Sequence, residues 1–410
     1  MVYHIRKAPD PVPLQVELSR WRRILYAVSL LLAAAFPLVP ASPGSAAIEP
    51  DWRLNPYPDG HRFAFTIVQD ADSAYSRRLA PLFDEFDALK MKLTATVFVF
   101  WAEWAHGGRS WTEWLSNATP EQSFFRPIAV PLVDPAERAF YLSLAARGHE
   151  IGMHSASETS DTAAQTERAF EYFTQVFGHP PSVYVEHSHK NNKEALVNEG
   201  ADPRSPYYIL EILRRYRPWV WLDDPLGLPR PENPRYFDLF SIPGGPFNAE
   251  LSRRYGLSKV FMRSGLAAQA DGDGFLNWYS PANIDLLERD RGLALVYTHL
   301  DKKWLDVTTR KMREPLRERL RYLASKNGWF APAGRILDRL LLMKNVSLQR
   351  TGKHVRIQNR NPVSVDSITL ISSAKAGLCG ARQVFRPSSS GDIVLGSIRS
   401  GEILDFTICR

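Results

Sequence analysis

The 410-residue chain has 51 Lys and Arg residues against 44 Asp and Glu residues, and 44% of its residues are hydrophobic. This is the composition of a soluble globular protein, and the length exceeds what one hydrophobic core usually holds, so we expect a large domain and a smaller one. The mild positive charge argues against nucleic acid as a partner, whereas it is compatible with an anionic cell envelope or polysaccharide surface.

Residues 1–47 have the pattern of a secretory signal peptide. Three arginines between positions 20 and 23 precede an apolar run at residues 24–36, and prolines and small residues follow up to a predicted cleavage near Ala47. The apolar run is short for a membrane span, but its extension through residues 38 and 39 keeps an uncleaved N-terminal anchor open as the alternative. In both cases we expect the rest of the chain outside the cytoplasm, either secreted or periplasmic.

Residues 48–343 alternate short apolar runs with helix-like segments, which is typical of a mostly parallel sheet. Seven such runs predict an α/β fold with a complete or incomplete β/α barrel. The expected strands are 62–70, 93–101, 149–154, 182–187, 219–224, 237–243 and 293–299. The expected helices are 76–91, 135–147, 163–177, 205–215 and 281–290, with a further helical stretch at 307–342.

Two regions depart from this alternation. Residues 102–133 predict a long surface insertion whose aromatic rings could stack on a sugar, and a satellite cluster that pins the loop to the barrel is an equally good interpretation. Residues 344–410 show period-two alternation with turn residues between the runs, which predicts a small all-β module. Cys379 and Cys409 lie in this module and could form a disulfide in an oxidising compartment.

Ionisable side chains follow several of the predicted strands, at the edge where the active sites of such barrels lie. Each of them alone could be a turn former, a helix cap or a buried core histidine, but their joint placement at one rim favours a functional site. These residues are Asp70, Asp72, His154, Glu158, His187 and His299.

Four sequence blocks carry a resemblance to a known family. "FTIVQDAD", "LTATVFVFW", "RGHEIGMHSASE" and "LALVYTH" occur in the order of the blocks of the NodB-like polysaccharide deacetylases, carbohydrate esterase family 4, within residues 60–300. The resemblance implies a distorted (β/α)7 barrel and a divalent metal ion, usually zinc. It also implies removal of acetyl groups from N-acetylated sugars.

The resemblance implies roles for the first and last blocks. The family has two adjacent aspartates, a base followed by a metal ligand, where this chain has Asp70 and Asp72 separated by Ala71. Their order assigns Asp70 as base and Asp72 as ligand. His299 stands where the family keeps the histidine that acts as general acid.

The remaining metal ligands are assigned from "RGHEIGMHSASE", which resembles the family's metal-binding histidine block. His154 matches the first metal-binding histidine, and Glu158 stands where the family has the second, four positions later. On a helical turn this i, i+4 spacing would place both side chains on one face. Alternatively, His187 from the neighbouring strand end supplies the third ligand. A site of one histidine with carboxylates suits manganese as well as zinc.

Together these features predict a secreted metal-dependent deacetylase that acts on the N-acetyl, or alternatively O-acetyl, groups of a glycan. Trp101, Trp104 and Trp304 are candidate walls for the sugar, with ordinary packing as the other interpretation. Where the family has its third block, this chain reads "VYVEHSHKNN", which lacks the arginine that orients the base in the family. The second hypothesis is therefore a barrel with altered or lost activity that binds carbohydrate or acts as a scaffold outside the cytoplasm.

Overall fold

The computed structural model describes most of the chain from Trp52 to Cys409. The predicted signal peptide and most of the predicted insertion lie outside the described residues. No helix in the described parts of the chain is long and apolar enough to cross a membrane. The described residues are 52–72, 74–102, 129–186, 192–222, 235–241, 245–264, 271–372, 376–380, 383–389 and 391–409.

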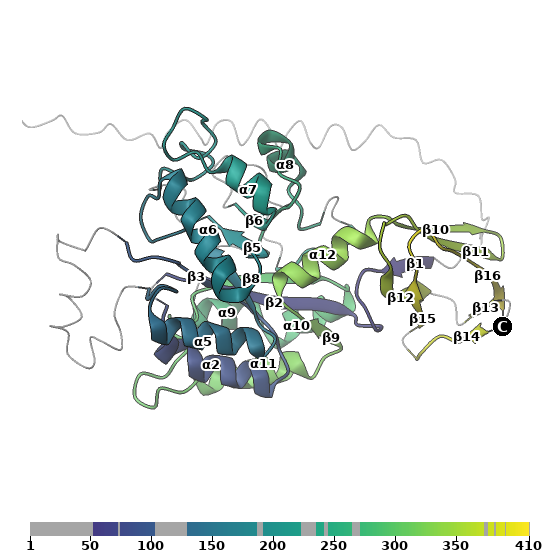
Figure 1. Cartoon of the computed structure of the whole chain (residues 1–410). Coiled ribbons are helices and arrows are strands. Elements are labelled where there is room, and N and C mark those ends of the chain that lie inside the picture. The colour runs from purple at the N-terminus through teal and green to yellow at the C-terminus, as the bar shows by residue number, and fades with distance from the viewer. Residues whose placement is uncertain are drawn as a thin grey trace, which may run out of the picture. The chain divides into compact units, whose positions relative to one another are not determined.

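A curled parallel sheet forms the centre of the protein (Figure 1). Its strand order is β7-β6-β5-β4-β3-β2-β8, and β9 also pairs with β2. The two edge strands, β7 and β8, meet at an isolated parallel bridge between Ser264, which follows β7, and Val296 in β8. The strands are β2 (Phe63–Gln69), β3 (Thr94–Val97), β4 (Glu150–His154), β5 (Val183–Val185), β6 (Trp219–Trp221), β7 (Val260–Phe261), β8 (Leu293–Thr298) and β9 (Gly328–Phe330). The expected α/β fold with an incomplete barrel is confirmed.

Residues along each strand alternate between two apolar environments. In β2, Phe63, Phe65 and Ile67 belong to the core under the outer helices, whereas Ala64 and Val68 belong to the core on the concave side. Both faces are covered, which explains why β2 reads as a continuous apolar run that is buried throughout.

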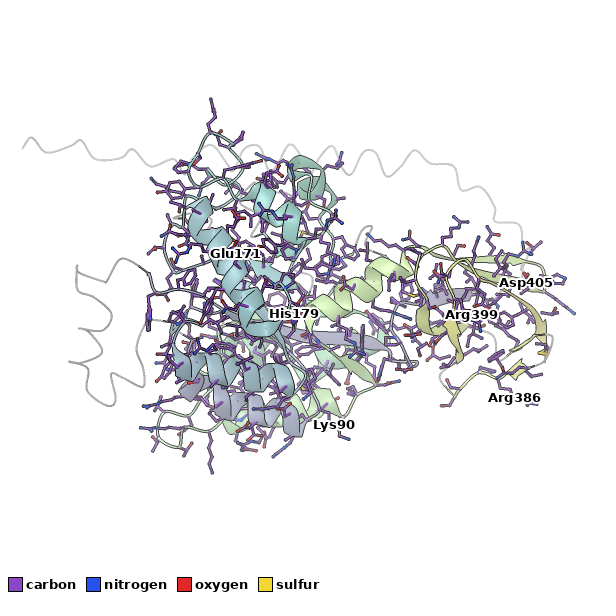
Figure 2. All side chains as sticks on the ribbon, viewed as in Figure 1. Lys90, Glu171, His179, Arg386, Arg399 and Asp405 are labelled. Atoms are coloured by element: carbon purple, nitrogen blue, oxygen red, sulfur yellow. A yellow bond between two sulfur atoms is a disulfide. The ribbon has the colours of Figure 1, made fainter. Side chains whose placement is uncertain are left out.

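Helices cover the outer face of the sheet, and α2 and α5 pack side by side there (Figure 1). Helix α6 begins with a capping box between Thr162 and Gln165 and ends at Gly178, whose φ of 78° suits glycine. Figure 2 shows the exposed side chains of Glu171 and His179 in this region. The helices of the barrel segment are α2 (Ser76–Ala88), α5 (Pro135–Ala146), α6 (Ala163–Phe177), α7 (Leu210–Tyr216), α8 (Ala249–Tyr255), α9 (Gly272–Trp278), α10 (Pro281–Arg289), α11 (Glu314–Ala324) and α12 (Ala333–Met343).

Helix α12 packs against the concave side of the sheet. Its residues Ile336, Leu337 and Leu340 share a core cluster with the inward residues of the strands. The carboxylate of Glu150, at the start of β4, accepts the N–H of Gly334 at 3.0 Å in the first turn of the helix. Burial raises the pKa of Glu150. Helix α12 thus lies at the amino end of β4. The opposite ends of the strands, their carboxyl ends, are where functional side chains can gather.

The C-terminal segment is all-β, as predicted, and β1, which precedes the barrel in the chain, joins it by pairing with β12. One sheet has the order β1-β12-β15 and the other β10-β11-β16-β13-β14. A buried ion pair of 2.7 Å between Arg291 and Asp392 joins this segment to the start of β8. The strands are β1 (Trp52–Asn55), β10 (Val346–Thr351), β11 (His354–Asn359), β12 (Val365–Ser372), β13 (Gly377–Cys379), β14 (Val384–Phe385), β15 (Asp392–Ile398) and β16 (Ile403–Cys409).

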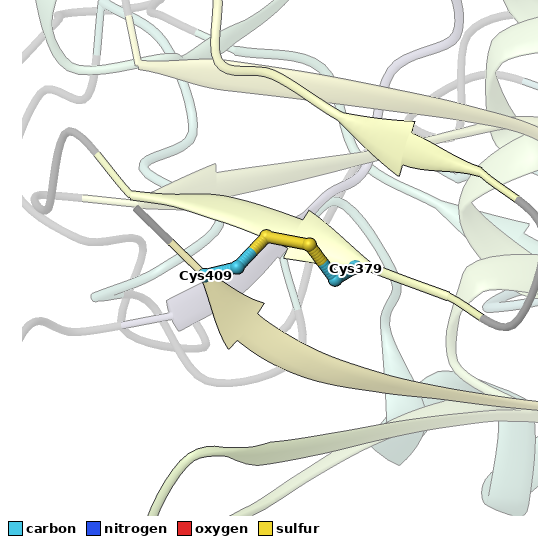
Figure 3. Close-up of a disulfide and its surroundings, with 2 residues drawn as sticks. All are labelled: Cys379 and Cys409. Carbon is cyan, nitrogen blue, oxygen red and sulfur yellow. A yellow bond between two sulfur atoms is a disulfide. The ribbon is translucent and has the colours of Figure 1, made fainter.

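A disulfide connects Cys379 in β13 to Cys409 at the end of β16 (Figure 3). These two strands are paired antiparallel, which brings the two Cα atoms to 5.9 Å. Disulfides persist mainly in proteins that work outside the cytoplasm, so the bond hints at an extracytoplasmic location.

Several predicted elements are wrong in detail. The predicted strand 237–243 is described only as far as residue 241, and there it is no strand but contributes an isolated bridge between Phe237 and Leu293. The seventh strand of the curled sheet is the two-residue β7, which the sequence analysis missed. The predicted helix 205–215 begins only at Leu210. The stretch 307–342 holds β9 between α11 and α12. Short strands carry too few residues to show a period of two.

Candidate metal centre

Asp70 and Asp72 lie at the carboxyl end of β2. The N–H of Asp70 donates to the carbonyl of Thr298 at 3.0 Å, so the backbone of Asp70 continues the pairing of β2 with β8. Its carboxylate accepts the N–H of Asp72, also at 3.0 Å. This side-chain-to-backbone turn folds the chain back on itself. Ala71, between them, packs with Phe98 and Ala129. The spacing of one residue therefore lets both carboxylates approach the same point.

His299 joins the two aspartates. Gln69 is paired with Thr298 in the parallel ladder, so the next residues along the two strands, Asp70 and His299, are neighbours. His299 Nε2 lies 3.7 Å from Oδ1 of Asp70 and 3.6 Å from Oδ2 of Asp72. One ligand atom from each of these three residues lies within 4.8 Å of the others. This largely buried group could bind a metal ion.

His154 approaches the same carboxylates from β4, of which it is the last residue. Its Nε2 lies 3.6 Å from Oδ1 of Asp70 and 3.7 Å from Oδ1 of Asp72. The two imidazoles thus face the same oxygen of Asp70 but different oxygens of Asp72. The His154 side chain is 2% exposed and the Asp72 side chain 36%, so Asp72 is the member most open to solvent.

Two neighbours, Thr96 on β3 and Phe98 directly after it, fix the orientation of the His154 ring. Thr96 Oγ1 lies 3.3 Å from His154 Nδ1, and the same hydroxyl donates to the carbonyl of Gln69 at 2.7 Å. The ring of Phe98 meets the imidazole edge to face, with centroids 4.8 Å apart. Nε2 is therefore the nitrogen that faces the carboxylates.

The charge state of His299 depends on the same carboxylates. Burial disfavours the imidazolium, but the nearby carboxylates of Asp72 and Asp70 outweigh burial and raise the pKa of His299. The hydroxyl of Tyr297 lies 3.3 Å from Nε2 of His299. This imidazole is thus held close to three oxygen-bearing side chains.

The other two predicted ligands do not join this group in the part of the chain that the structure describes. His154 ends a strand instead of lying on a helical turn, and Ser155 after it has a left-handed φ of 51°, which turns the chain away. Glu158 follows in a loop, and its Oε1 accepts the N–H of Ala129 at 3.0 Å. His187 lies outside the described residues.

The structure describes two of the three tryptophans that were predicted to contact a sugar. Trp304 is fully buried and packs with Phe86 and Phe275 in the core, so it presents no ring face to a sugar. Trp101 is half-buried just after β3. Trp104 lies outside the described residues.

Two residues at the centre were missed by the sequence analysis, Thr96 and Tyr297. Both point to the concave side, because each stands two positions before an inward residue that directly follows its strand, Phe98 or His299. Counting in steps of two back from the strand ends would have found them.

The fold and the centre define a class of protein, an α/β barrel with a carboxylate and imidazole group at the carboxyl ends of its strands. No family model matches the sequence, and no curated protein is similar to it at a significant level. Among solved structures, the chain is similar to a probable polysaccharide deacetylase from Pseudomonas aeruginosa PAO1, with a TM-score of 0.39 and 11% identity over 70% of this chain and 93% of that one.

Two further structures are similar at the same low level. A variant of the peptidoglycan deacetylase PdaC from Bacillus subtilis has a TM-score of 0.31 and 10% identity over 70% of this chain and 95% of that one. AmyP in complex with maltose has a TM-score of 0.33 and 9% identity over 84% and 96%. Similarity at this level does not assign the chain to a family.

Proposed function

We propose that this protein is a divalent-metal-dependent hydrolase that removes acetyl groups, in the first place N-acetyl groups, from a glycan outside the cytoplasm. The observation that carries the proposal is the convergence of two carboxylates and two imidazoles, from three different strands, at one point of the barrel. Carboxylates and imidazoles are common ligands of divalent ions.

The spacing of the donors fits a metal ion. Nε2 of His299 lies 3.7 Å from Oδ1 of Asp70 and 3.6 Å from Oδ2 of Asp72, farther than an ordinary hydrogen bond. Two ligand atoms that each lie about 2.1 Å from a zinc ion at the tetrahedral angle are about 3.4 Å apart. The donors are therefore spaced as atoms that share a cation.

Asp70, Asp72 and His299 would hold the cation in this proposal. Bound there, a divalent cation supplies Lewis acidity, which makes a water molecule more acidic and polarises an acyl carbonyl. The sequence assigned Asp70 as base and His299 as acid, but their close grouping with Asp72 favours a shared ligand role.

His154 would then carry the proton. The Thr96 hydroxyl donates its proton to the carbonyl of Gln69, so it accepts a hydrogen bond from Nδ1 of His154. Nδ1 therefore carries the ring proton, and Nε2 keeps its lone pair. Nε2 takes a proton from the attacking water, whose oxygen bonds to the acyl carbon. The same proton passes to the leaving nitrogen as the carbon–nitrogen bond breaks, which yields acetate and a free amine.

A direct test is acetate release from tetra-N-acetylchitotetraose and from acetylated xylan. The purified protein is first stripped with a chelator and then reloaded with zinc or manganese. We expect turnover that disappears on stripping, returns on reloading, and is lost in His154→Gln. An enzyme specific for esters would act on the xylan alone. If the reloaded protein releases no acetate from either substrate, the proposal is wrong.

A further inference from the structure

Tyr297 is a chemically active side chain that neither the motif nor the ligand group includes. It stands on β8 two residues before His299, so the period of a strand places both on the concave side of the sheet. Its hydroxyl oxygen lies 3.3 Å from Nε2 of His299, and the residue is only half-buried. The phenol therefore lies at the edge of the candidate metal centre.

The Tyr297 ring is held on three sides. Trp221 meets it edge to face with centroids 5.0 Å apart, and the His299 ring does so at 5.2 Å. The guanidinium of Arg263 lies over the ring, 4.7 Å from its centroid. A donor fixed in this way needs little rearrangement when charge develops beside it, which is what makes electrostatic catalysis effective.

The hydroxyl is a hydrogen-bond donor with a replaceable acceptor. A tyrosine phenol keeps its proton in neutral solution, because its ordinary pKa is about 10. Nε2 of His299 can accept that proton only while its lone pair is available. Once the lone pair holds a cation, the O–H requires another acceptor close to the same place.

We propose that Tyr297 is a further catalytic residue, whose hydroxyl donates a hydrogen bond to the acyl oxygen of the substrate. This inference rests on the proposed function. When the water oxygen bonds to the acyl carbon, the π electron pair of the carbonyl moves onto the acyl oxygen, which becomes negative. The pair returns as the carbon–nitrogen bond breaks. Tyr297 keeps its own proton throughout and stabilises the negative oxygen between these two events.

The experiment compares Tyr297→Phe with the wild-type protein. The substitution removes one oxygen and leaves the ring contacts in place. Tyr236→Phe is the matched control, because Tyr236 is also half-buried and its hydroxyl binds a carboxylate, that of Asp290, outside the candidate centre. Three quantities are measured: turnover of tetra-N-acetylchitotetraose, zinc affinity by competition with a chromophoric chelator, and binding of N-(methylphosphonyl)glucosamine, whose tetrahedral phosphorus mimics the charged intermediate.

For Tyr297→Phe we expect kcat to fall about 100-fold, as for other lost oxyanion donors, with KM and zinc affinity unchanged. Binding of the phosphonyl analogue should weaken by a similar factor, since only the charged tetrahedral state uses the hydroxyl. Tyr236→Phe should match the wild type in all three. Unchanged turnover, or a loss of turnover that merely follows a loss of zinc, overturns the role of Tyr297 alone. An inactive wild-type protein overturns the proposed function and this inference together.

Discussion

The hydroxyl of Thr96 lies 3.3 Å from Nδ1 of His154 and donates its only proton to the carbonyl of Gln69. It can therefore only accept from the imidazole, which places the ring proton on Nδ1. A partner of this kind on the second nitrogen is the usual way in which proteins fix the tautomer of a working histidine.

Removing the Thr96 hydroxyl should lower the activity although the two carboxylates and two imidazoles of the centre all remain. We expect Thr96→Val, which keeps the shape of the side chain, to lower kcat by about 10 to 100-fold. Thr96→Ser restores a hydroxyl and should recover most of the activity. Steady-state kinetics check the prediction, and a Val variant as active as the Ser variant would show that the tautomer is not controlled from Thr96.

The two imidazoles should respond differently to substitution. His299→Gln removes a proposed ligand and should weaken zinc binding by more than about 100-fold, since even partners that only support a ligand typically contribute 10 to 100-fold. His154→Gln should keep zinc and lose turnover. Competition titration with a chelator measures both affinities. The opposite pattern would restore the roles that the sequence resemblance assigns, with His154 on the metal and His299 as acid.

Helix α12 is positioned by a close approach that only glycine allows. A Cβ at Gly334 would overlap the Glu150 carboxylate, which also accepts the hydroxyls of Thr94 and Ser182 at 2.7 Å. Gly334→Ala should therefore lower the free energy of unfolding by about 2 kcal/mol, the usual cost of overpacking. Arg335→Ala, on the exposed side of the same helix, is the control and should change it by less than about 0.5 kcal/mol. Urea unfolding distinguishes the two, and equal stability of both variants would refute the argument.

A buried acid pair makes stability depend on pH. Glu194 accepts the N–H of Asp161 at 3.1 Å and an N–H of the Asn192 amide at 3.0 Å. Burial, and then the charge of Asp161, raise the pKa of Glu194 from 4.5 to about 7. The folded protein binds this proton more tightly than the unfolded chain. The contribution to stability is thus complete below pH 4.5 and is lost as the pH rises through 7.

Glu194→Gln should remove this dependence. Relative to the wild type, the free energy of unfolding of the variant should rise by on the order of 3 kcal/mol between pH 4.5 and pH 8. Urea unfolding of both proteins at the two pH values measures the difference. A constant difference across this range would mean that Glu194 titrates normally in the folded state.

The members of the centre that could be predicted from the sequence are those set by strand geometry. Asp70, His154 and His299 each end a strand or directly follow one, and parallel strands bring such positions to one rim. Thr96 was missed because a threonine inside an apolar run looks like any other strand residue. Its role depends on which side chain the neighbouring strand places opposite it, and one sequence does not give the register between strands.

The residues beyond the strands were less predictable. The i, i+4 spacing of His154 and Glu158 suggested a helical turn, but the left-handed backbone at Ser155 sends the chain elsewhere. The contact that joins the two edges of the barrel was also not predicted. Ser264 bridges to Val296, its N–H and hydroxyl both donate to the carbonyl of Leu295, and the hydroxyl accepts the N–H of Leu295. A single residue that replaces a strand ladder leaves no periodic pattern in the sequence.

The central claim is that Asp70 and Asp72 share one cation with an imidazole, and the most direct test is the metal stoichiometry of the full chain. Equilibrium dialysis against zinc, with metal measured by mass spectrometry, should give close to one ion per wild-type chain and far less for Asp72→Asn, while circular dichroism shows that the variant remains folded. A wild-type chain that binds no ion, or an Asp72→Asn chain that binds it equally well, would contradict the account.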